Sequence, residues 1–307
     1  MSQNSSVTVH VPATSANLGP GFDCLGLTLN LWNQATFTLC GTGIHVKVHG
    51  MGSQSLPKNG RNLIARSALK LYALMGMTAP DGLFIECHNQ IPLDSGLGSS
   101  AAACLTGLLG ANVLLGCPMG ADDLLKLGND IEGHPDNVAA AIMGSLVMVS
   151  DVEGRPMARR IDIPEIEVAV AVPQIHLPTH AARSVLPREV PLKDAVFNTS
   201  RALLVVEALR SGDFQLLGKV MEDRLHQPFR FKMIPGAVEA EVAALKAGAF
   251  SVALSGAGPS LVAFHSPHDE VETICIAEAM VQAFGDLGVK ADGLALKVSS
   301  SGASVEP

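Results

Sequence analysis

The stretch IPLDSGLGSSAAA, from Ile91 to Ala103, restricts the fold of this chain more than any other segment. Two glycines, Gly96 and Gly98, permit a sharp turn in which the backbone approaches a ligand closely. The alanine-rich run that follows predicts a helix over residues 99–115. The first N–H groups of a helix have no partner within it and carry the positive end of its dipole, so the segment predicts an anion-binding loop. The alternative is a serine-capped helix after a glycine turn, with no ligand.

The segment differs from the two common phosphate-binding loops. A P-loop requires a lysine before its Ser or Thr, and none follows here. The spacing G-x-G-x-x-A of a dinucleotide-binding loop does occur at Gly96, Gly98 and Ala101. It should lead to a second strand and to an acidic residue about twenty positions later. After Leu115 the sequence instead predicts a turn and another helix, so we interpret this match as accidental.

The loop has no basic residue of its own, because no lysine or arginine occurs between Leu71 and Leu125. A polyphosphate bound here must therefore be met by backbone dipoles, hydroxyl groups and a metal ion. Mg²⁺ fits, since it takes few carboxylates and prefers phosphate and water oxygens. Glu132, in the segment NDIEGHPDN, is the first candidate for the carboxylate.

Composition narrows the class of protein. A length of 307 residues predicts two domains, and 48% hydrophobic residues provide for large cores. A net charge of −8 argues against a nucleic-acid partner. The six cysteines form no CxxC pair or metal-spaced cluster, which is typical of a reducing compartment. The N-terminus lacks the pattern of a signal peptide, and the longest apolar run is too short to span a bilayer, so we expect a soluble cytoplasmic protein with no membrane partner.

Strands and helices are interspersed without a regular βαβ alternation, which predicts an α+β fold rather than a doubly wound sheet. Expected helices cover 62–75, 99–115, 122–131, 137–142, 181–186, 199–209, 238–246 and 269–284. Expected strands cover 7–11, 34–39, 44–48, 83–87, 145–149, 168–172 and 293–298, with a strand, tight turn and strand at 250–265 and a turn-rich loop at 13–29. The polar patch at 151–165 is the candidate boundary between an N-terminal domain, 1–160, and a C-terminal domain, 161–307.

Three segments resemble the three motifs of the GHMP small-molecule kinases. They are PATSANLGPGFDCLGL (Pro12–Leu27), PLDSGLGSSAAA (Pro92–Ala103) and LSGAGPSLVAF (Leu254–Phe264). Their order and separation match across nearly the whole chain. The first motif, and the segments GHPDNVAAAIMG, PTHAAR and HQPFR, are similar to the family members that act on L-homoserine. The resemblance implies an N-terminal domain like ribosomal protein S5 domain 2, a C-terminal ferredoxin-like domain and a homodimer.

The activity that this resemblance implies is transfer of the γ-phosphate of ATP to the side-chain hydroxyl of L-homoserine, on the route to threonine. Mg²⁺ would be held by Ser100 and Glu132. Asn62 would contact the nucleoside, although it is equally placed to cap the helix that follows. Asp94 lies within the phosphate loop, and we expect its side chain to point away from the phosphates. The residues implied in ATP binding are Asn62, Pro92, Leu93, Asp94, Ser95, Gly96, Leu97, Gly98, Ser99, Ser100 and Ala101.

The residues implied in homoserine binding suit a zwitterion, because an ammonium needs a carboxylate partner and a carboxylate needs a guanidinium. Asp23 would supply the first, and Arg183 or Arg230 the second or a counter-charge for the γ-phosphate. The full set is Asn17, Asp23, His134, Asn137, Arg183 and Arg230, of which Asn17, Asp23, Asn137 and Arg183 are the candidate catalytic residues.

Other interpretations of these residues remain open from the sequence. Asn17 and Asp23 also fit the role of turn formers only, and Arg230 that of a solvated surface charge. Asp136 is placed to cap the helix that begins near Asn137, and Thr179 to cap the one that carries Arg183. The segment at 255–260 fits a tight hairpin as well as a substrate contact.

Mechanistically, one GHMP strategy places an aspartate beside the attacking hydroxyl, as in mevalonate kinase. Here Asn137 takes what we interpret as that position, and an amide does not accept the proton usefully. The hypothesis is therefore that no dedicated strong base acts and the proton leaves late, with Asp23 as the side chain that would overturn it. The rival functions are a GHMP kinase for mevalonate, shikimate or a cytidine-linked polyol, and a GHMP-fold sensor that binds ligand without turnover.

Overall fold

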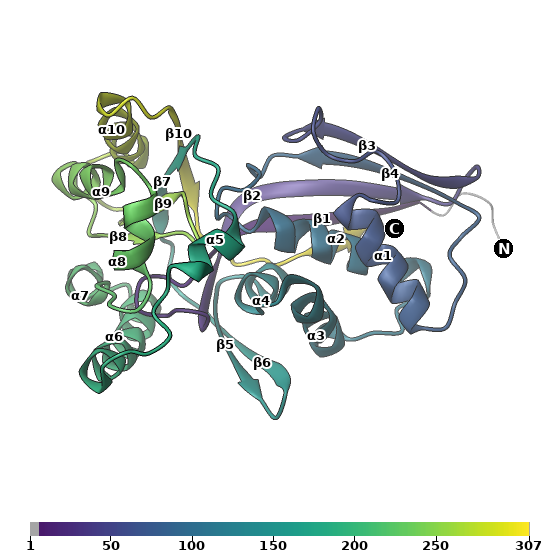
Figure 1. Ribbon diagram of the computed structural model, residues 1–307, viewed down its shortest axis with the longest axis horizontal. Coiled ribbons are helices and arrows are strands. Elements are labelled where there is room, and N and C mark those ends of the chain that lie inside the picture. Colours follow the sequence, from purple (N-terminus) through teal and green to yellow (C-terminus); the bar gives the residue numbers. More distant parts are fainter. Residues whose placement is uncertain (1–5, 307) are drawn as a thin grey trace.

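The structure, a computed structural model, describes residues 6–306 and contains two sheets, each covered by helices (Figure 1). The first sheet has the strand order β11-β1-β2-β4-β3, and β5 and β6 extend it from β2. Only β3 and β4 are parallel within it. Its strands are β1 (Ser6–Ala16), β2 (Leu25–Thr38), β3 (Gly43–Gly50), β4 (Gly82–Asn89), β5 (Leu146–Val152), β6 (Arg155–Ile161) and β11 (Ser304–Glu306).

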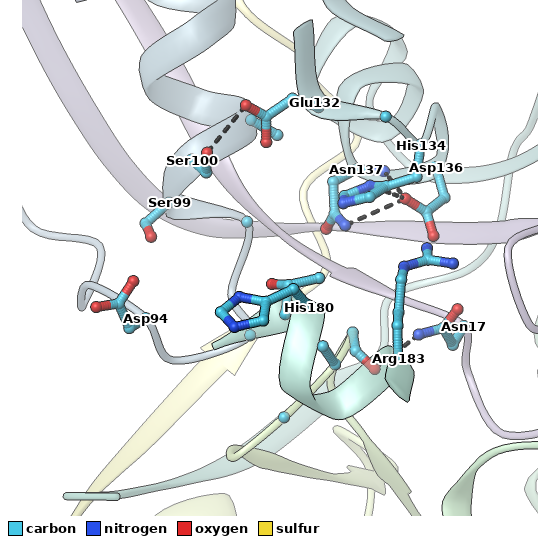
Figure 2. Close-up of a pocket in the computed structure, with 18 of the residues that line it drawn as sticks. Asn17, Asp94, Ser99, Ser100, Glu132, His134, Asp136, Asn137, His180 and Arg183 are labelled. Atoms are coloured by element: carbon cyan, nitrogen blue, oxygen red, sulfur yellow. Dashed lines mark hydrogen bonds and ion pairs between the residues drawn. The ribbon is translucent and has the colours of Figure 1, made fainter. Parts of the chain in front are cut away.

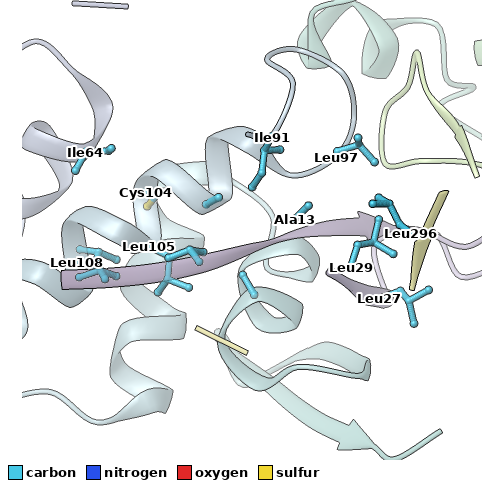
Figure 3. Close-up of a cluster of buried hydrophobic side chains, with 14 of the residues drawn as sticks. Ala13, Leu27, Leu29, Ile64, Ile91, Leu97, Cys104, Leu105, Leu108 and Leu296 are labelled. Carbon is cyan, nitrogen blue, oxygen red and sulfur yellow. The ribbon is translucent and has the colours of Figure 1, made fainter. Parts of the chain in front are cut away.

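Four helices lie on one face of this sheet (Figure 1). They are α1 (Leu63–Leu74), α2 (Ser99–Leu114), α3 (Ala121–Glu132) and α4 (Asp136–Met143). α2 is buried along much of its length, and its side chains Leu105 and Leu108 pack in the same core as Leu27 and Leu29 of β2 (Figure 3). This packing holds the N-terminus of α2 in a fixed position at the edge of the core.

The second sheet is antiparallel, in the order β10-β7-β9-β8. Its strands are β7 (Glu167–Pro173), β8 (Ser251–Leu254), β9 (Leu261–His265) and β10 (Ala291–Lys297). Alternation along β7 sends valines to one face and alanines to the other. Val168 and Val170 join the large core shared with the first sheet, whereas Ala169 and Ala171 join a second core.

The helices that follow β7 in the chain pack on both sides of the second sheet. α9 (Ala237–Lys246) and α10 (Thr273–Asp286) cover the alanine face of β7, and α6 (Leu192–Ser211) and α7 (Phe214–Val220) contribute to the valine side. α5 (Thr179–Ser184) and α8 (Gln227–Arg230), followed by a 3-10 turn at Phe231–Met233, are short. Within residues 6–306, no helix has both the length and the apolar character needed to cross a membrane. The predicted two-domain α+β fold is confirmed.

The polar patch at 151–165 is for the most part not a linker. β5 and β6 form a hairpin across it, paired from Leu146 and Ile161 to Val152 and Arg155. Its turn has positive φ at Glu153 (56°) and Gly154 (77°), which suits a right-twisted hairpin. Only residues 162–166 connect β6 to β7. The domain division at residue 160 stays a prediction, and β11 returns to pair with β1 in the first sheet.

Several helices and strands have other bounds than those predicted from the sequence. β1 runs to Ala16 and β2 begins at Leu25, so the predicted loop at 13–29 shrinks to 17–24. Pairing with β2 and burial in the core extend β1 beyond its polar-looking residues, such as Thr14 and Ser15. α6 begins at Leu192, seven residues before the predicted start, and its exposed apolar side chains obscure the helical pattern. α7 was not predicted, although Asp213 caps it by accepting from the Leu216 N–H at 2.8 Å.

Candidate active site

A cavity of about 640 Å³ lies between the N-terminus of α2, the α3–α4 connection, α5 and the β8–β9 turn. Figure 2 shows side chains from these elements converging on it. It brings together most of the residues chosen from sequence: Asn17, Asp23, Asp94, Gly96, Gly98, Ser99, Ser100, Ala101, Glu132, His134, Asn137, Arg183 and Arg230. The remaining predicted nucleotide residues, Asn62, Pro92, Leu93, Ser95 and Leu97, are not among those that line it.

The glycines of the loop are required by geometry. Gly96 and Gly98 have φ values of 83° and 72°. A Cβ on Gly98 would lie 2.0 Å from Oγ1 of Thr14, and one on Gly96 would lie 2.3 Å from the carbonyl oxygen of Ser255. Either contact is too short for real atoms, so any side chain would force the loop away from its supports.

Helix α2 begins without a serine cap. Gly98 is its N-cap residue, in the left-handed conformation and without a side-chain cap hydrogen bond. Ser99 and Ser100 are therefore the first helical residues, and the serine-cap interpretation is wrong. The N–H groups of the first turn, from Ser99 to Ala101, have no intrahelical carbonyl to bind and lie at the cavity wall. This end of α2 therefore has the free N–H groups and the positive dipole that an anion site requires, and anion binding there stays a prediction.

The three sequence motifs meet at this loop. The Thr14 N–H donates to the Leu97 carbonyl at 3.1 Å, and the Ser260 N–H donates to the Ser95 carbonyl at 3.1 Å. The Ser255 hydroxyl donates to the Gly96 carbonyl at 2.8 Å. The loop is thus held from β1 on one side and from the β8–β9 turn on the other.

Ser100 and Glu132 are already in contact. The Ser100 hydroxyl donates to Oε1 of Glu132 at 2.9 Å, as the dashed line in Figure 2 shows. Burial raises the pKa of Glu132 above its usual value, against the opposing effect of the Ser100 hydrogen bond. Glu132 is also the last residue of α3, where the helix dipole is negative. A partly buried carboxylate at such a position is suited to binding a cation.

Asp23 and Arg183 form a bidentate ion pair across the cavity. Nη2 of Arg183 lies 2.7 Å from Oδ1 of Asp23, and Nη1 lies 3.0 Å from Oδ2. The hydrogen bond from Arg183 to Asp23 raises the pKa of the guanidinium. Arg183 comes from α5 and Asp23 from the β1–β2 loop, so the pair joins the two halves of the molecule.

The β1–β2 loop has the turn geometry expected of Asn and Asp, with φ values of 74° at Asn17 and 56° at Asp23. Oδ1 of Asn17 accepts from the Asp23 N–H at 2.9 Å, and its Nδ2 donates to the Gly256 carbonyl at 2.7 Å. Asn17 therefore fixes the position of Asp23, and both residues also line the cavity. The turn-former interpretation is confirmed, and the role of both residues in substrate binding stays a prediction.

Arg230 is buried, with 1% of its surface exposed, and is not a solvated surface charge. Its Nε donates to the Ala182 carbonyl at 3.2 Å and its Nη1 to the Gly256 carbonyl at 3.1 Å. Burial, reinforced by the charge of Arg183, lowers the pKa of Arg230 to about 10, so it stays charged at neutral pH. The guanidinium carbons of Arg183 and Arg230 lie 5.6 and 5.2 Å from the centre of the Phe22 ring. The two guanidinium groups therefore line the cavity beside Phe22.

Asp136 organises the start of α4. Its Oδ1 accepts from the Asn137 N–H at 2.7 Å, from Nδ2 of Asn137 at 3.2 Å and from Nδ1 of His134 at 3.2 Å (Figure 2). The hydrogen bond that His134 donates to Asp136 raises the pKa of His134. Oδ1 of Asn137 accepts from the Thr14 hydroxyl at 2.8 Å. Both ends of the Asn137 amide are therefore engaged inside the protein.

Asp94 lines the cavity, with Oδ2 3.8 Å from Nδ1 of His176. The loop backbone at Asp94, with φ of 51°, presents this exposed side chain at the rim, where water solvates its charge. Thr179 is the first residue of α5 rather than its cap, because Pro178 takes the N-cap position. Thr179 lines the cavity instead.

Two histidines were not singled out from the sequence. His180, on α5, lines the cavity opposite the phosphate loop (Figure 2).

His226 is fully buried, and burial lowers its pKa. Its Nε2 lies 2.8 Å from the Gly19 carbonyl, and its Nδ1 lies 3.2 Å from Nη1 of Arg230. A neutral His226 thus donates at Nε2 and accepts at Nδ1. The i, i+4 spacing to Arg230 in HQPFR was the available signal.

Asn62 is the N-cap of α1, as one of its two interpretations stated. Its Oδ1 accepts from the Ile64 N–H at 3.0 Å, and its Nδ2 donates to the Pro57 carbonyl at 2.9 Å. We expect Asn62→Ala to lower the free energy of unfolding by about 1 kcal/mol, because a helix cap is lost. Urea unfolding measures this, with Asn62→Asp as a control that retains the cap. Unchanged stability combined with a raised KM for ATP would instead assign Asn62 to the nucleoside.

Comparisons with known proteins agree with this geometry. Residues 62–145 match the family model "GHMP kinases N terminal domain", and residues 205–286 match "GHMP kinases C terminal". Homoserine kinase from Moorella thermoacetica is 42% identical over 97% of this chain and 99% of its own length. That from Crocosphaera subtropica is 40% identical over 98% of each. The crystal structure of homoserine kinase from Cytophaga hutchinsonii superposes with a TM-score of 0.87 at 31% identity, covering 100% of this chain and 99% of that one.

Proposed function

The chain belongs to the homoserine kinases of the GHMP kinase family, and we propose how its residues divide the cavity between ATP and L-homoserine. The reaction transfers the γ-phosphate of ATP to the side-chain hydroxyl of L-homoserine in threonine biosynthesis. One observation supports the division above all: a helix N-terminus for phosphates and an ion pair for a zwitterion line the same cavity.

The phosphates of ATP would lie along the first turn of α2, where the N–H groups from Ser99 to Ala101 face them. Mg²⁺ would be held by Ser100 and Glu132, whose oxygen atoms lie 2.9 Å apart. When bound, Mg²⁺ neutralises charge on the transferring phosphoryl group. The donor set fits this ion, since a hydroxyl and one carboxylate leave room for water and phosphate oxygens.

L-Homoserine would bind beside the γ-phosphate, with its charged groups exchanging for the Asp23–Arg183 pair. Its ammonium replaces a guanidinium N–H at Asp23, and its carboxylate meets Arg183 and the buried Arg230. Insertion of a zwitterion between the paired groups preserves charge balance, because one ion pair is replaced by two. His134 would add a further donor on the same side, since Asp136 favours its protonated form.

Proton transfer would need no dedicated base. The amide of Asn137 is engaged by Thr14 and Asp136, and an amide is not basic. Both oxygens of Asp23 accept hydrogen bonds from Arg183. The residues of the cavity therefore act by positioning and by charge, and the proton would leave late, toward the phosphoryl group or water.

The homodimer, the cytoplasmic location and the domain division at residue 160 are further parts of this proposal. They are supported by the family resemblance. Sedimentation equilibrium measures the first of them directly.

A coupled ADP-release assay with ATP and Mg²⁺ tests the function. We expect turnover with L-homoserine and only background with mevalonate, shikimate or no acceptor, because Asp23 selects an ammonium. Turnover with another alcohol would keep the loop assignments and overturn the substrate site. Binding of ATP by folded protein, without turnover of any acceptor, would favour the sensor alternative.

A further inference from the structure

The outer face of the β3–β4 pair carries a cluster that the kinase reaction does not use. In the parallel register, His49 lies opposite His88 and Lys47 opposite Glu86. Alternation places these four side chains on the face that points away from α1–α4, while Val46 and Val48 point into the core (Figure 1). None of the four lines the cavity.

The cluster has the dimensions of a metal site. One ligand atom each from His49, Glu86 and His88 can be chosen so that all three lie within 4.8 Å of one another. Nε2 of His49 is 3.0 Å from Oε1 of Glu86, and the two imidazole rings stack with their centres 4.6 Å apart. Zinc binds imidazole nitrogen and carboxylate oxygen at about 2.0–2.2 Å, so the two rings, stacked with an interplanar angle of 8°, must rotate out of the stack before all three atoms reach one ion.

We propose that His49, Glu86 and His88 bind Zn²⁺, with water as the fourth ligand, at the edge of the first sheet. β3 is the edge strand there, paired only with β4 among the described strands. A metal ion bridging β3 and β4 would hold the edge strand in register and stabilise it against fraying. The site is therefore structural and does not depend on the proposed function.

Lys47 takes the place of the cation when no metal is present. Its Nζ lies 2.9 Å from Oε1 of Glu86, the same oxygen that His49 contacts. The ammonium must leave when zinc enters, and an exposed ion pair of this kind is weak enough to be displaced.

The test measures zinc binding to the tag-free chain by isothermal titration and by the rise in Tm on adding zinc chloride. We expect His49→Ala and His88→Ala each to weaken binding at least tenfold and to abolish the rise in Tm. Lys47→Met should strengthen binding about two- to fivefold, because the competing cation is gone. His45→Ala is the matched control, since His45 is an exposed histidine on the same strand outside the cluster.

Two results would overturn the proposal. One is zinc affinity in His88→Ala equal to that of the unmodified chain, which would locate the binding at exposed thiols such as Cys40 or elsewhere. The other is weaker binding in Lys47→Met, which would show that the lysine supports the ion rather than competing with it. Homoserine phosphorylation by His88→Ala in zinc-free buffer reports on folding and should be unchanged.

Discussion

Replacement of Glu132 by glutamine is expected to lower kcat about 10²- to 10³-fold while making the unliganded protein more stable. The loss follows from the proposed metal site, because a bound metal contributes several kcal/mol of transition-state charge stabilisation. The gain in stability follows from burial, which raises the pKa of the Glu132 carboxyl. The ionised form at neutral pH therefore opposes folding, and a neutral amide removes that opposition.

The gain in stability is expected to depend on pH, which gives a second measurement. An acid whose pKa is raised in the folded state destabilises the protein above that pKa and ceases to do so below the unfolded value. The Tm difference between Glu132→Gln and the unmodified chain should therefore shrink as the pH falls through the range where the folded carboxyl protonates. Activity is measured as ADP release against Mg²⁺ concentration, and thermal unfolding is followed across pH.

A matched control lies on the same helix. Asp130 is an exposed carboxylate of α3 that pairs with Lys126 at 2.7 Å. Asp130→Asn should leave kcat and the Mg²⁺ dependence unchanged. Full activity in Glu132→Gln at ordinary Mg²⁺ concentration would remove Glu132 from the metal site.

Replacement of Asp23 by asparagine is expected to raise the KM for L-homoserine about ten- to a hundredfold while kcat changes less than about tenfold. The KM effect is that of losing a charge-assisted hydrogen bond to the substrate ammonium. The kcat effect is small because Asp23, paired with Arg183 in the unliganded protein and with the substrate ammonium in the complex, is proposed as a binding residue and not a base. Steady-state kinetics at saturating ATP separate the two parameters.

The control is a second carboxylate of the same cavity, at the phosphate loop. Asp94→Asn should leave the KM for L-homoserine unaltered, because Asp94 lies at the rim near His176 rather than near Arg183. A fall in kcat of about 10²- to 10⁴-fold in Asp23→Asn, with KM unaltered, would identify Asp23 as the general base and refute the proposed mechanism.

Local chemistry made much of the molecule predictable. The glycines of the phosphate loop, the start of α2 near Ser99 and the Asn62 cap depend on backbone conformations that short segments impose. The strand–turn–strand at 250–265 was likewise predicted, because β8 and β9 flank a turn rich in glycine. Such features need no partner distant in the chain to specify them.

The features that could not be predicted depend on contacts between residues distant in the sequence. The surroundings of Arg230 could not be predicted from its own segment, because its guanidinium donates to carbonyl groups of Ala182 and Gly256 in other segments. The same holds for Asp94, which the loop backbone turns toward the cavity, and for His226, whose neutral state depends on Gly19 and Arg230. A charged side chain looks alike in sequence whether water or protein surrounds it.

The sequence by itself determined that a helix begins after the glycine loop and that this segment carries no basic residue, and it predicted that hydroxyl and carboxylate groups assist an anion bound there. Only the tertiary structure decided that Ser100 meets Glu132, that Asp23 is paired with Arg183, and that histidines of β3 and β4 face each other. The physical reason is range: backbone conformation and helix dipoles are set within a few residues, whereas ion pairs and ligand clusters form between segments that only folding brings together.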